Sequence, residues 1–381
     1  MLGELKFGAC QQLVFKLYCA GLLRGYSAMN YFHIAYRLAD RAPWVAATTG
    51  VALCSFILAS RAADTPRLIA PERIDWSVQS IFQKDDRDDK FKDQPRMNLS
   101  GAACAETTPK FKACLIANDE KRYAQFFSIA GKMLSPGALI RMSDADNDPD
   151  AEGVAYAKGY FYVTGSHGRS RHSDKANETS YAVFRIPVDP ETGLPKYKFT
   201  DKKKAPEIDV SDRLREVLPN HPLLKTAYDK PLKQGGLNIE GIAVRNGRMH
   251  FGLRAPSNAR SAYIASVDVA AAFTKADELK SKVTAVELGD NTGIRDIAAI
   301  EDGILILAGP TQEETVPYTI WHWSDAGDSL KPLATLDLKG VDPSAKAEIL
   351  LPLDVSAASI RVLVMFDGLE NGGPRSFDIK R

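Results

Sequence analysis

An alternating run of carboxylates is the densest cluster of candidate metal ligands in this chain. Asp144, Asp146, Asp148 and Asp150 occupy every second position of the run Asp144-Ala-Asp-Asn-Asp-Pro-Asp150. Carboxylate oxygens are ligands that calcium prefers. The run is not an EF-hand loop, because Pro149 stands where such a loop needs glycine. It therefore predicts either a calcium site of another kind or a solvated acidic loop.

Two glutamates recur in the same local frame. Asp150-Ala-Glu-Gly153 and Asn238-Ile-Glu-Gly241 are each followed by an apolar run, a turn and a second apolar run. The frame returns at Ile294-Arg-Asp296 and is weaker elsewhere. Its positions are 52, 88, 55 and 52 residues apart, at Ser100, Glu152, Glu240, Arg295 and Ala347. Repetition at this spacing indicates a repeat fold.

The elements that must position these residues are short strands. Most units contain four apolar runs, and Asn246-Gly247 and Asp302-Gly303 are turn signals typical of hairpins. Four strands in about 40–50 residues are typical of a propeller blade. The sequence therefore predicts an all-β fold, a five-bladed β-propeller. A sixth blade remains possible within the interval of 88 residues.

The ends of the repeat predict how the ring closes. The fifth unit has three strands and ends at Ser376-Phe-Asp-Ile379. We expect Ile74–Phe82 to supply the missing outer strand and so to remove two exposed sheet edges. The long interval carries an insertion at about 211–236, which begins with a predicted short helix, Ser211–Leu218. This insertion is either a lid over the ligand-binding mouth or a solvated decoration.

A propeller gathers distant residues on one face. The loops that enter the inner strands and the loops between second and third strands share that face, which we call the mouth. The candidate catalytic residues there are Glu152, Glu240, His167 and Arg254, and the candidate ligand-binding residues are Asp119, Glu120, Arg295, Asp296 and Asp367. Each of them could instead form a structural ion pair. The chosen frame predicts that Asp296 and Glu348 point to the other side of their strands.

Two cysteines face each other in this register. Cys104 ends the inner strand of the first blade, and Cys114 begins its hairpin partner. Directly opposed residues have about the Cα separation that a disulfide needs. We therefore predict a Cys104–Cys114 disulfide, with two buried free thiols as the alternative.

The N-terminal segment resembles an export signal. Residues 42–60 carry no charged side chain, Arg41 precedes them, and Ser60-Arg-Ala62 ends them with small residues at cleavage positions. This pattern predicts a targeting segment over residues 1–63 that is cleaved near Ala62, and a propeller over 64–381 that is periplasmic or secreted. A membrane anchor at 42–60 is the alternative. Met29 precedes a complete signal, so residues 1–28 are candidates for an over-extended start.

Charge and missing motifs exclude several classes of function. After residue 63 the chain keeps 43 basic and 46 acidic side chains, so its net charge is −3. Without a basic field we expect no nucleic-acid partner. The sequence contains no Gly-rich phosphate loop, G-x-S-x-G, HExxH or CxxC motif. We expect a monomer that contacts the membrane only through its N-terminal segment and binds a small molecule or an envelope polymer.

A family resemblance rests on four blocks of sequence. They are Asn118-Asp-Glu120, Asp150–Gly153 with Thr164–His167, Asn238–Gly241 with Gly252–Arg254, and Gly293–Asp296. From about Asn98 to its end the chain resembles the bacterial domain of unknown function 3616 family, which implies an exported propeller without an established activity. The Glu-Gly frame is more distantly similar to the esterase-like phytase propellers, although the chain shows no complete catalytic set of theirs.

Two classes of function therefore stay open. The first is a binding propeller of the cell envelope, with the charged mouth as its site. The second is a calcium-assisted phosphoesterase or esterase, as the phytase resemblance implies. In that case the metal, Arg254 and Arg295 would grip a phosphate ester, with His167 or a carboxylate as acid or base. Calcium is the only cofactor that either class calls for.

Overall fold

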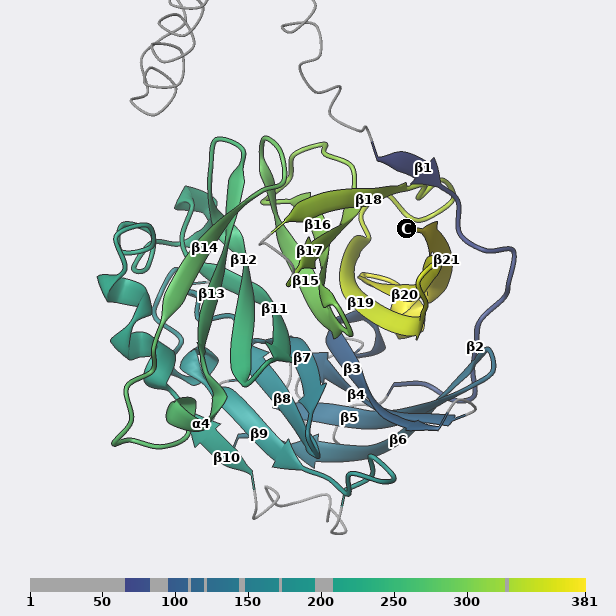
Figure 1. Ribbon diagram of the computed structural model, residues 1–381, viewed down its shortest axis with the longest axis horizontal. Coiled ribbons are helices and arrows are strands. Elements are labelled where there is room, and N and C mark those ends of the chain that lie inside the picture. Colours follow the sequence, from purple (N-terminus) through teal and green to yellow (C-terminus); the bar gives the residue numbers. More distant parts are fainter. Residues whose placement is uncertain are drawn as a thin grey trace, which may run out of the picture. The chain divides into compact units, whose positions relative to one another are not determined.

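Five small sheets, each built on three or four strands consecutive in the chain, surround a common centre (Figure 1). The first strand of each sheet lies innermost, and the later strands follow outward. The inner strands are β3 (Leu99–Thr108), β7 (Ala151–Ala157), β11 (Asn238–Arg245), β15 (Thr292–Ile300) and β19 (Lys346–Val355). The prediction of an all-β, five-bladed β-propeller is thereby confirmed.

The structure, a computed structural model, describes residues 66–82, 95–108, 111–119, 122–143, 148–170, 173–195, 208–325 and 329–381. These residues belong to one compact unit, Pro66–Arg381. The predicted signal segment with Met29 and Ala62 lies outside the described residues, as do Glu120, Asp144 and Asp146. Within these ranges no helix has the length and apolar character needed to cross a bilayer.

The outer strands complete the blades. Blade 1 adds β4 (Phe111–Asn118), β5 (Tyr123–Ala130) and β6 (Met133–Arg141), and blade 2 adds β8 (Tyr160–Gly165), β9 (Val183–Pro187) and β10 (Asp209–Ser211). Blade 3 adds β12 (Arg248–Asn258), β13 (Ser261–Asp268) and β14 (Lys282–Glu287), and blade 4 adds β16 (Gly303–Pro310), β17 (Thr319–Ser324) and β18 (Leu330–Leu336). Blade 5 adds β20 (Ser359–Asp367) and β21 (Arg375–Lys380). Short helical turns join some of them: η2 (Pro95–Met97), η3 (Glu178–Tyr181), α4 (Val269–Ala272) and η7 (Glu370–Gly372).

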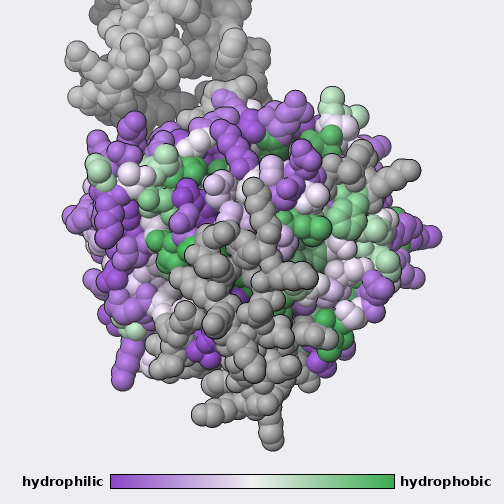
Figure 2. All heavy atoms as spheres, turned by 90° about the horizontal axis from the view of Figure 1, so that it is seen from below, coloured by the Kyte–Doolittle hydropathy of each residue, from purple (hydrophilic) through white to green (hydrophobic). Residues whose placement is uncertain are grey.

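The hydrophobic core is divided among the five interfaces between blades. Each interface holds its own cluster of buried apolar side chains, such as Leu115 with Phe161 between blades 1 and 2 and Phe251 with Tyr181 between blades 2 and 3. The other three clusters lie between blades 3 and 4, 4 and 5, and 5 and 1. Because both faces of a blade are covered, its middle strands are apolar throughout instead of alternating. The outer wall, seen in Figure 2, is mostly hydrophilic with scattered apolar residues.

All five inner strands carry a β-bulge at the same level. The register with the second strand shifts near the start of each inner strand, around Gly101, Glu152, Glu240, Arg295 and Glu348. A bulge inserts one unpaired residue and re-aims its side chain. The repeated frame in the sequence is therefore the signature of a repeated bulge.

Glycines let the inner strands approach each other at this level. A Cβ on Gly153 would lie 2.8 Å from the backbone nitrogen of Ile242, and one on Gly241 would lie 2.6 Å from that of Ile297. Both distances are too short for a real side chain, so only glycine permits the contact. The strands that carry Glu152 and Glu240 therefore touch their neighbours backbone to backbone.

The ring closes differently from the prediction. Residues Arg67–Val78, which we call the N-terminal strap, do not add a fourth strand to blade 5. Instead β1 (Arg67–Ile69) pairs in parallel with β18 of blade 4, and β2 (Ser77–Val78) pairs in parallel with β6 of blade 1. Between them the strap crosses blade 5, where the Glu72 N–H donates to the Ser376 carbonyl at 2.8 Å. Pro71 has no N–H, so a continuous ladder cannot form at this point.

The insertion is a packed part of the fold. Its start forms two short 3₁₀ turns, η4 (Arg213–Glu216) and η5 (Leu218–Asn220), instead of the predicted helix, and η6 (Leu232–Gln234) lies near its end. Pro219 and Pro222 cannot donate the bonds that a longer helix needs. Leu224 is fully buried in the core cluster between blades 2 and 3. A solvated decoration is therefore the wrong description.

Two predicted local features are present. Asn246 and Gly247 both have positive φ, 50° and 76°, as a tight Asn-Gly hairpin turn requires. Cys104 lies opposite Cys114 in the ladder of β3 and β4, and the two form a disulfide with their Cα atoms 3.9 Å apart.

Candidate functional site

Charged side chains from four blades meet near the centre of the ring, and we call them the axial cluster. Each occupies the bulge of its inner strand: Glu152, Glu240, Arg295 and Glu348. Their exposed fractions lie between 0% and 2%. The shared bulge explains why side chains so distant in the sequence converge, because each bulge occurs at the same level of its blade.

Two arginines neutralise part of the carboxylate charge. Arg254, from β12, donates from Nη1 to one oxygen of Glu240 at 2.9 Å, and Nη2 of Arg295 lies 3.4 Å from the other oxygen. Arg295 also donates from Nη2 to Glu348. The Nε of Arg254 donates to the Thr311 carbonyl at 2.7 Å. The cluster is a buried ion-pair network, the form in which charges withdrawn from water are tolerated.

Blade 1 contributes a hydroxyl instead of a charge. Gly101 fills its bulge with φ +59°, and a Cβ there would lie 2.4 Å from the Glu152 carbonyl oxygen. The neighbouring Ser100 donates its hydroxyl to Glu152 Oε2 at 2.9 Å. Residues from all five blades therefore form the axial cluster.

Asp296 connects blades 4 and 5. Its carboxylate accepts hydrogen bonds from the N–H groups of Ile297 and Leu350, each at 2.8 Å. Burial raises the pKa of Asp296 well above its ordinary value, and the charges of Glu240 and Glu348 act in the same direction, whereas the two N–H bonds oppose them. The Asp296 side chain therefore has a structural role, because it links two inner strands.

Three glutamates of the axial cluster could hold a metal ion. One oxygen from each of Glu152, Glu240 and Glu348 lies within 4.8 Å of the others. Carboxylate oxygens suit a hard cation such as calcium. Arg295 contacts two of these glutamates, however, and its positive charge opposes a cation at the same place. The residues fit an ion-pair network better than a metal centre.

The prediction for Glu348 was wrong. The sequence frame was aligned on Ala347, which would point Glu348 away from the other charged residues. In the structure the register shifts between Ala347 and Ile349, so Glu348 is the bulge residue and its carboxylate meets Arg295. The signal was present, because Ala347-Glu348 repeats the small-residue–glutamate pair of Ala151-Glu152.

His167 occupies a different environment. Its ring packs edge-on against Tyr181, with centroids 5.9 Å apart, and Tyr181 stacks on Tyr228 of the insertion at 6.1 Å. Burial lowers the pKa of His167 to about 3, and the charge of Arg215 adds to this effect. Among the described residues neither ring nitrogen has a hydrogen-bond partner. The imidazole is therefore neutral at pH 7.

The described part of the acidic run forms a hydrogen-bonded turn. Asp148 accepts the Asp150 N–H at 3.1 Å, and Asp150 accepts the Ser166 hydroxyl. Asp150 has φ 48°, a conformation that aspartate tolerates better than most residues. The predicted calcium ligands Asp148 and Asp150 thus accept hydrogen bonds within the loop that leads into β7.

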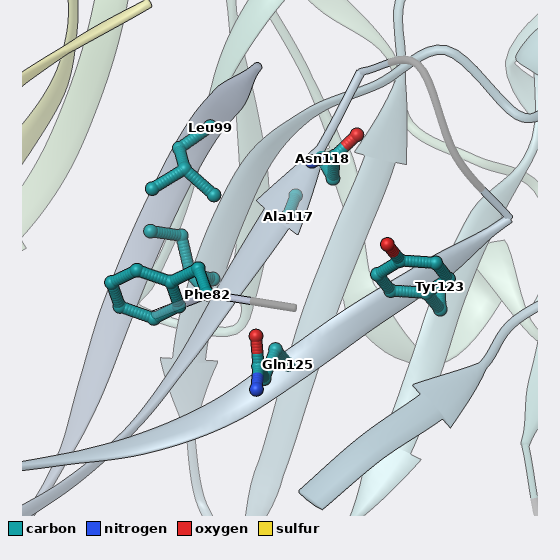
Figure 3. A pocket seen from close by; sticks show the side chains of 7 residues that line it. Phe82, Leu99, Ala117, Asn118, Tyr123 and Gln125 are labelled. Carbon is teal, nitrogen blue, oxygen red and sulfur yellow. The ribbon is translucent and has the colours of Figure 1, made fainter. Parts of the chain in front are cut away.

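The other predicted ligand residues lie at the mouth end of their strands. Asp119 directly follows β4 and is buried, and Asp367 is the last residue of β20. Near them a cavity of about 10 Å³ lies beside Tyr123, with Phe82 and Leu99 on its opposite side (Figure 3). Such a volume holds about one water molecule. It is too small for an organic ligand.

A larger cavity lies further along the axis. Its volume is about 610 Å³, and the ends of all five inner strands line it, which are the ends remote from the axial cluster. Alanines and branched aliphatic side chains predominate, and the charged residues among them are Lys112, Arg245, Glu301 and Asp354. Sequence reasoning missed this cavity. Its signal was the small residues that follow the repeated frame, such as Ala155 and Ala298.

Comparison with protein families gives a clear assignment. A family model described as "Protein of unknown function (DUF3616)" matches residues 118–372. The chain belongs to this family. The matched range contains the axial cluster except for Ser100 and Gly101, so the resemblance seen in the sequence blocks is confirmed. No curated protein sequence matches this DUF3616 chain.

Solved structures with low identity share this arrangement of strands only loosely. An exo-β-1,3-galactanase from Phanerochaete chrysosporium has a TM-score of 0.38 at 11% identity, and the match covers 73% of this chain and 59% of that enzyme. Aldose sugar dehydrogenase from Streptomyces coelicolor has a TM-score of 0.33 at 11% identity, covering 74% and 79%. GH43B of the Bacteroides ovatus xyloglucan locus has a TM-score of 0.36 at 13% identity, covering 75% and 53%. This DUF3616 protein thus spans about three fifths of the galactanase.

Proposed function

We propose that this protein is a binding propeller that takes a small ligand with both apolar and polar groups into its axial cavity. The observation that carries the proposal is the cavity of about 610 Å³ to which every inner strand contributes. Ligand pockets are commonly about 300–1,000 Å³, mainly apolar, and lined by a few placed polar groups. Lys112, Arg245, Glu301 and Asp354 are such groups.

This proposal moves the ligand away from the predicted charged mouth. Glu152, Glu240 and Arg295 are fully buried and engaged in the ion-pair network, so no ligand reaches them without opening it. The cavity lies at the other end of the inner strands, where a ligand displaces water from aliphatic side chains such as Val154 and Ile297 and reaches the charged groups beside them.

A neutral fluorescent probe tests the axial cavity. N-phenyl-1-naphthylamine becomes brighter in apolar surroundings, and we expect one saturable site. Ala299 lines the cavity and is exposed, so Ala299→Trp fills part of the space. We expect Ala299→Trp to abolish binding, whereas Ala130→Trp, at an exposed position outside the lining, keeps it. Unsaturable binding, or equal binding by both variants, would refute the proposal.

A calcium-assisted phosphoesterase is the second candidate, and one observation favours it. Glu152, Glu240 and Glu348 bring three carboxylate oxygens within 4.8 Å. Hydrolysis of a generic phosphate ester that needs calcium, stops with chelator and is lost in Glu240→Gln would establish it. If no ester in a panel is hydrolysed and chelator leaves the melting temperature unchanged, the binding propeller remains the proposed function.

We also propose that the protein works outside the cytoplasm. The Cys104–Cys114 disulfide supports this location, because disulfides persist mainly in oxidising compartments. N-terminal sequencing of the expressed protein should find a chain that begins close to Asp64, in the periplasmic or secreted fraction. Recovery of the intact N-terminus in the membrane fraction would instead indicate an anchor at 42–60.

A further inference from the structure

A second cavity lies between blades 3 and 4, and we call it the interblade pocket. Its volume is about 270 Å³, and its walls come from the β11–β12 turn and from strands β12, β13, β14, β16 and β17. Arg248, His250, Thr284 and Trp323 are among its lining residues. A cavity of about 150 Å³ accommodates benzene, so this volume admits a ligand with a single six-membered ring.

One arginine in this pocket is held in place but lacks an acidic partner. Arg248 donates from Nη2 to the carbonyl oxygens of Ser266, at 3.0 Å, and Lys280, at 2.8 Å. It also bonds the Ser266 hydroxyl from Nη2 at 3.0 Å. No ion pair among the described residues includes Arg248. Its Nε and Nη1 donors therefore remain for a ligand, in a side chain whose orientation is already fixed.

The pocket has an excess of positive charge. Arg245 is balanced by Asp325, to which its Nε donates at 2.7 Å. Arg248 adds a positive charge beyond that pair. His250 adds none at pH 7, because burial and the Arg248 charge lower its pKa to about 4. An anion entering the interblade pocket would meet an attractive field.

An aromatic and imidazole surface lies beside these charges. Trp323 is half-buried and packs edge-on against His250, with ring centroids 5.8 Å apart. The buried Nδ1 of His250 has no hydrogen-bond partner within the described part of the chain. A ligand hydroxyl can donate a hydrogen bond to this nitrogen. The indole of Trp323 offers an apolar face against which a ring can pack.

From these contacts we propose that the interblade pocket binds a small carboxylate carried on a six-membered ring. The carboxylate accepts a charge-assisted hydrogen bond from Nε or Nη1 of Arg248, the two donors that the protein does not use. Such a bond to an ionised acceptor is roughly twice as strong as one between neutral groups. The ring lies against Trp323. This site is separate from the axial cavity, although Arg245 contributes to the walls of both.

Calorimetric titration with matched probes tests the proposal at constant ionic strength. D-glucuronate and benzoate carry a carboxylate on a saccharide and on an aromatic ring, and D-glucose and benzamide are their uncharged counterparts. We expect at least one of the two carboxylates to bind with 1:1 stoichiometry and at least about tenfold more tightly than its uncharged counterpart. Which of the two binds identifies the kind of ring. Failure of both carboxylates, or equal binding of charged and uncharged forms, overturns the proposal.

Variants assign the binding to this pocket. Arg248→Gln should weaken it by at least about tenfold. Thr284→Glu, at a partly exposed lining position, should abolish it by placing a carboxylate near Arg248. Arg260→Gln, at an exposed arginine outside the pocket lining, should change nothing. Unaltered affinity in Thr284→Glu, with a melting temperature like that of the wild type, contradicts the assignment even if Arg248→Gln fails to fold.

Discussion

Removal of the central guanidinium is the sharpest test of the axial cluster. Arg295 contacts Glu240 at 3.4 Å and donates to Glu348, and its side chain is 1% exposed. In Arg295→Met these two carboxylates lose their shared positive partner while staying out of water. Breaking a buried ion pair from one side costs roughly 3–5 kcal/mol.

That free energy corresponds to a measurable shift in melting temperature. The unit Pro66–Arg381 has about 300 residues. At about 2.1 cal/mol/K per residue, its unfolding entropy is about 0.6 kcal/mol/K, so Arg295→Met should melt about 5–8 °C below the wild type. Differential scanning calorimetry measures this shift directly. A second variant, Arg295→Met with Glu348→Gln, should recover at least about 1.5 kcal/mol relative to the sum of the single changes.

A partly exposed ion pair provides the control. Arg361 lies 2.7 Å from Glu72 of the N-terminal strap, and their side chains are 29% and 24% exposed. Arg361→Met should cost less than about 1 kcal/mol, because water already solvates both groups. If Arg295→Met shifted the melting temperature no more than Arg361→Met does, the axial cluster would not be the buried network described above.

Three further predictions concern pH, the disulfide and close packing. Burial lowers the pKa of His167 in the folded protein to about 3, from its ordinary value of 6.5. The unfolded chain therefore takes up the proton first as pH falls, so His167 should lower the stability by about 2 kcal/mol between pH 7 and pH 5. The backbone of His167 has a positive φ, which asparagine tolerates. In His167→Asn the free energy of unfolding, measured by urea titration, should therefore depend less steeply on pH. Reductant or Cys114→Ala should lower the stability by about 2–3 kcal/mol for this short loop, and the reduced intact protein should be heavier than the oxidised protein by two hydrogen atoms. Gly241→Ala should cost about 1–3 kcal/mol in thermal melts because its methyl group meets the Ile297 backbone nitrogen, whereas Gly137→Ala, where a Cβ has no neighbour closer than 3.3 Å and φ is not positive, should cost less.

The strands were predictable because their signals are local. Apolar runs such as Ala262–Val267 and the Asn246-Gly247 turn depend on residues close in sequence, and β13 and its neighbours appear where they were expected. The repeat in the sequence was enough to predict that Glu240 and Arg295 lie close together. A periodic frame places equivalent residues at equivalent levels of the ring, whatever their distance along the chain.

The remaining features depend on pairings that no local pattern contains. A single-residue shift decides whether Glu348 faces the axis, and the repeat is weakest at that point. The strap strand β1 pairs with β18, which lies more than 250 residues away, and not with the edge strand of blade 5. The interblade pocket combines Arg248 with Trp323, which belong to different blades, so neither residue alone indicated a site.

The N-terminal strap has a consequence for the order in which the molecule can be assembled. Its first strand pairs with Ala334–Leu336, and the Trp76 indole donates to Ser376 across 300 residues of sequence. The part of the domain synthesised first therefore finds its partners only after nearly all the rest has emerged. Contacts of such long range form late and slowly. The leading part of the domain therefore stays incompletely paired until blades 4 and 5 have been synthesised, and a truncation that removes only the final strand should delete the hydrogen bonds of Glu72 and Trp76 to Ser376.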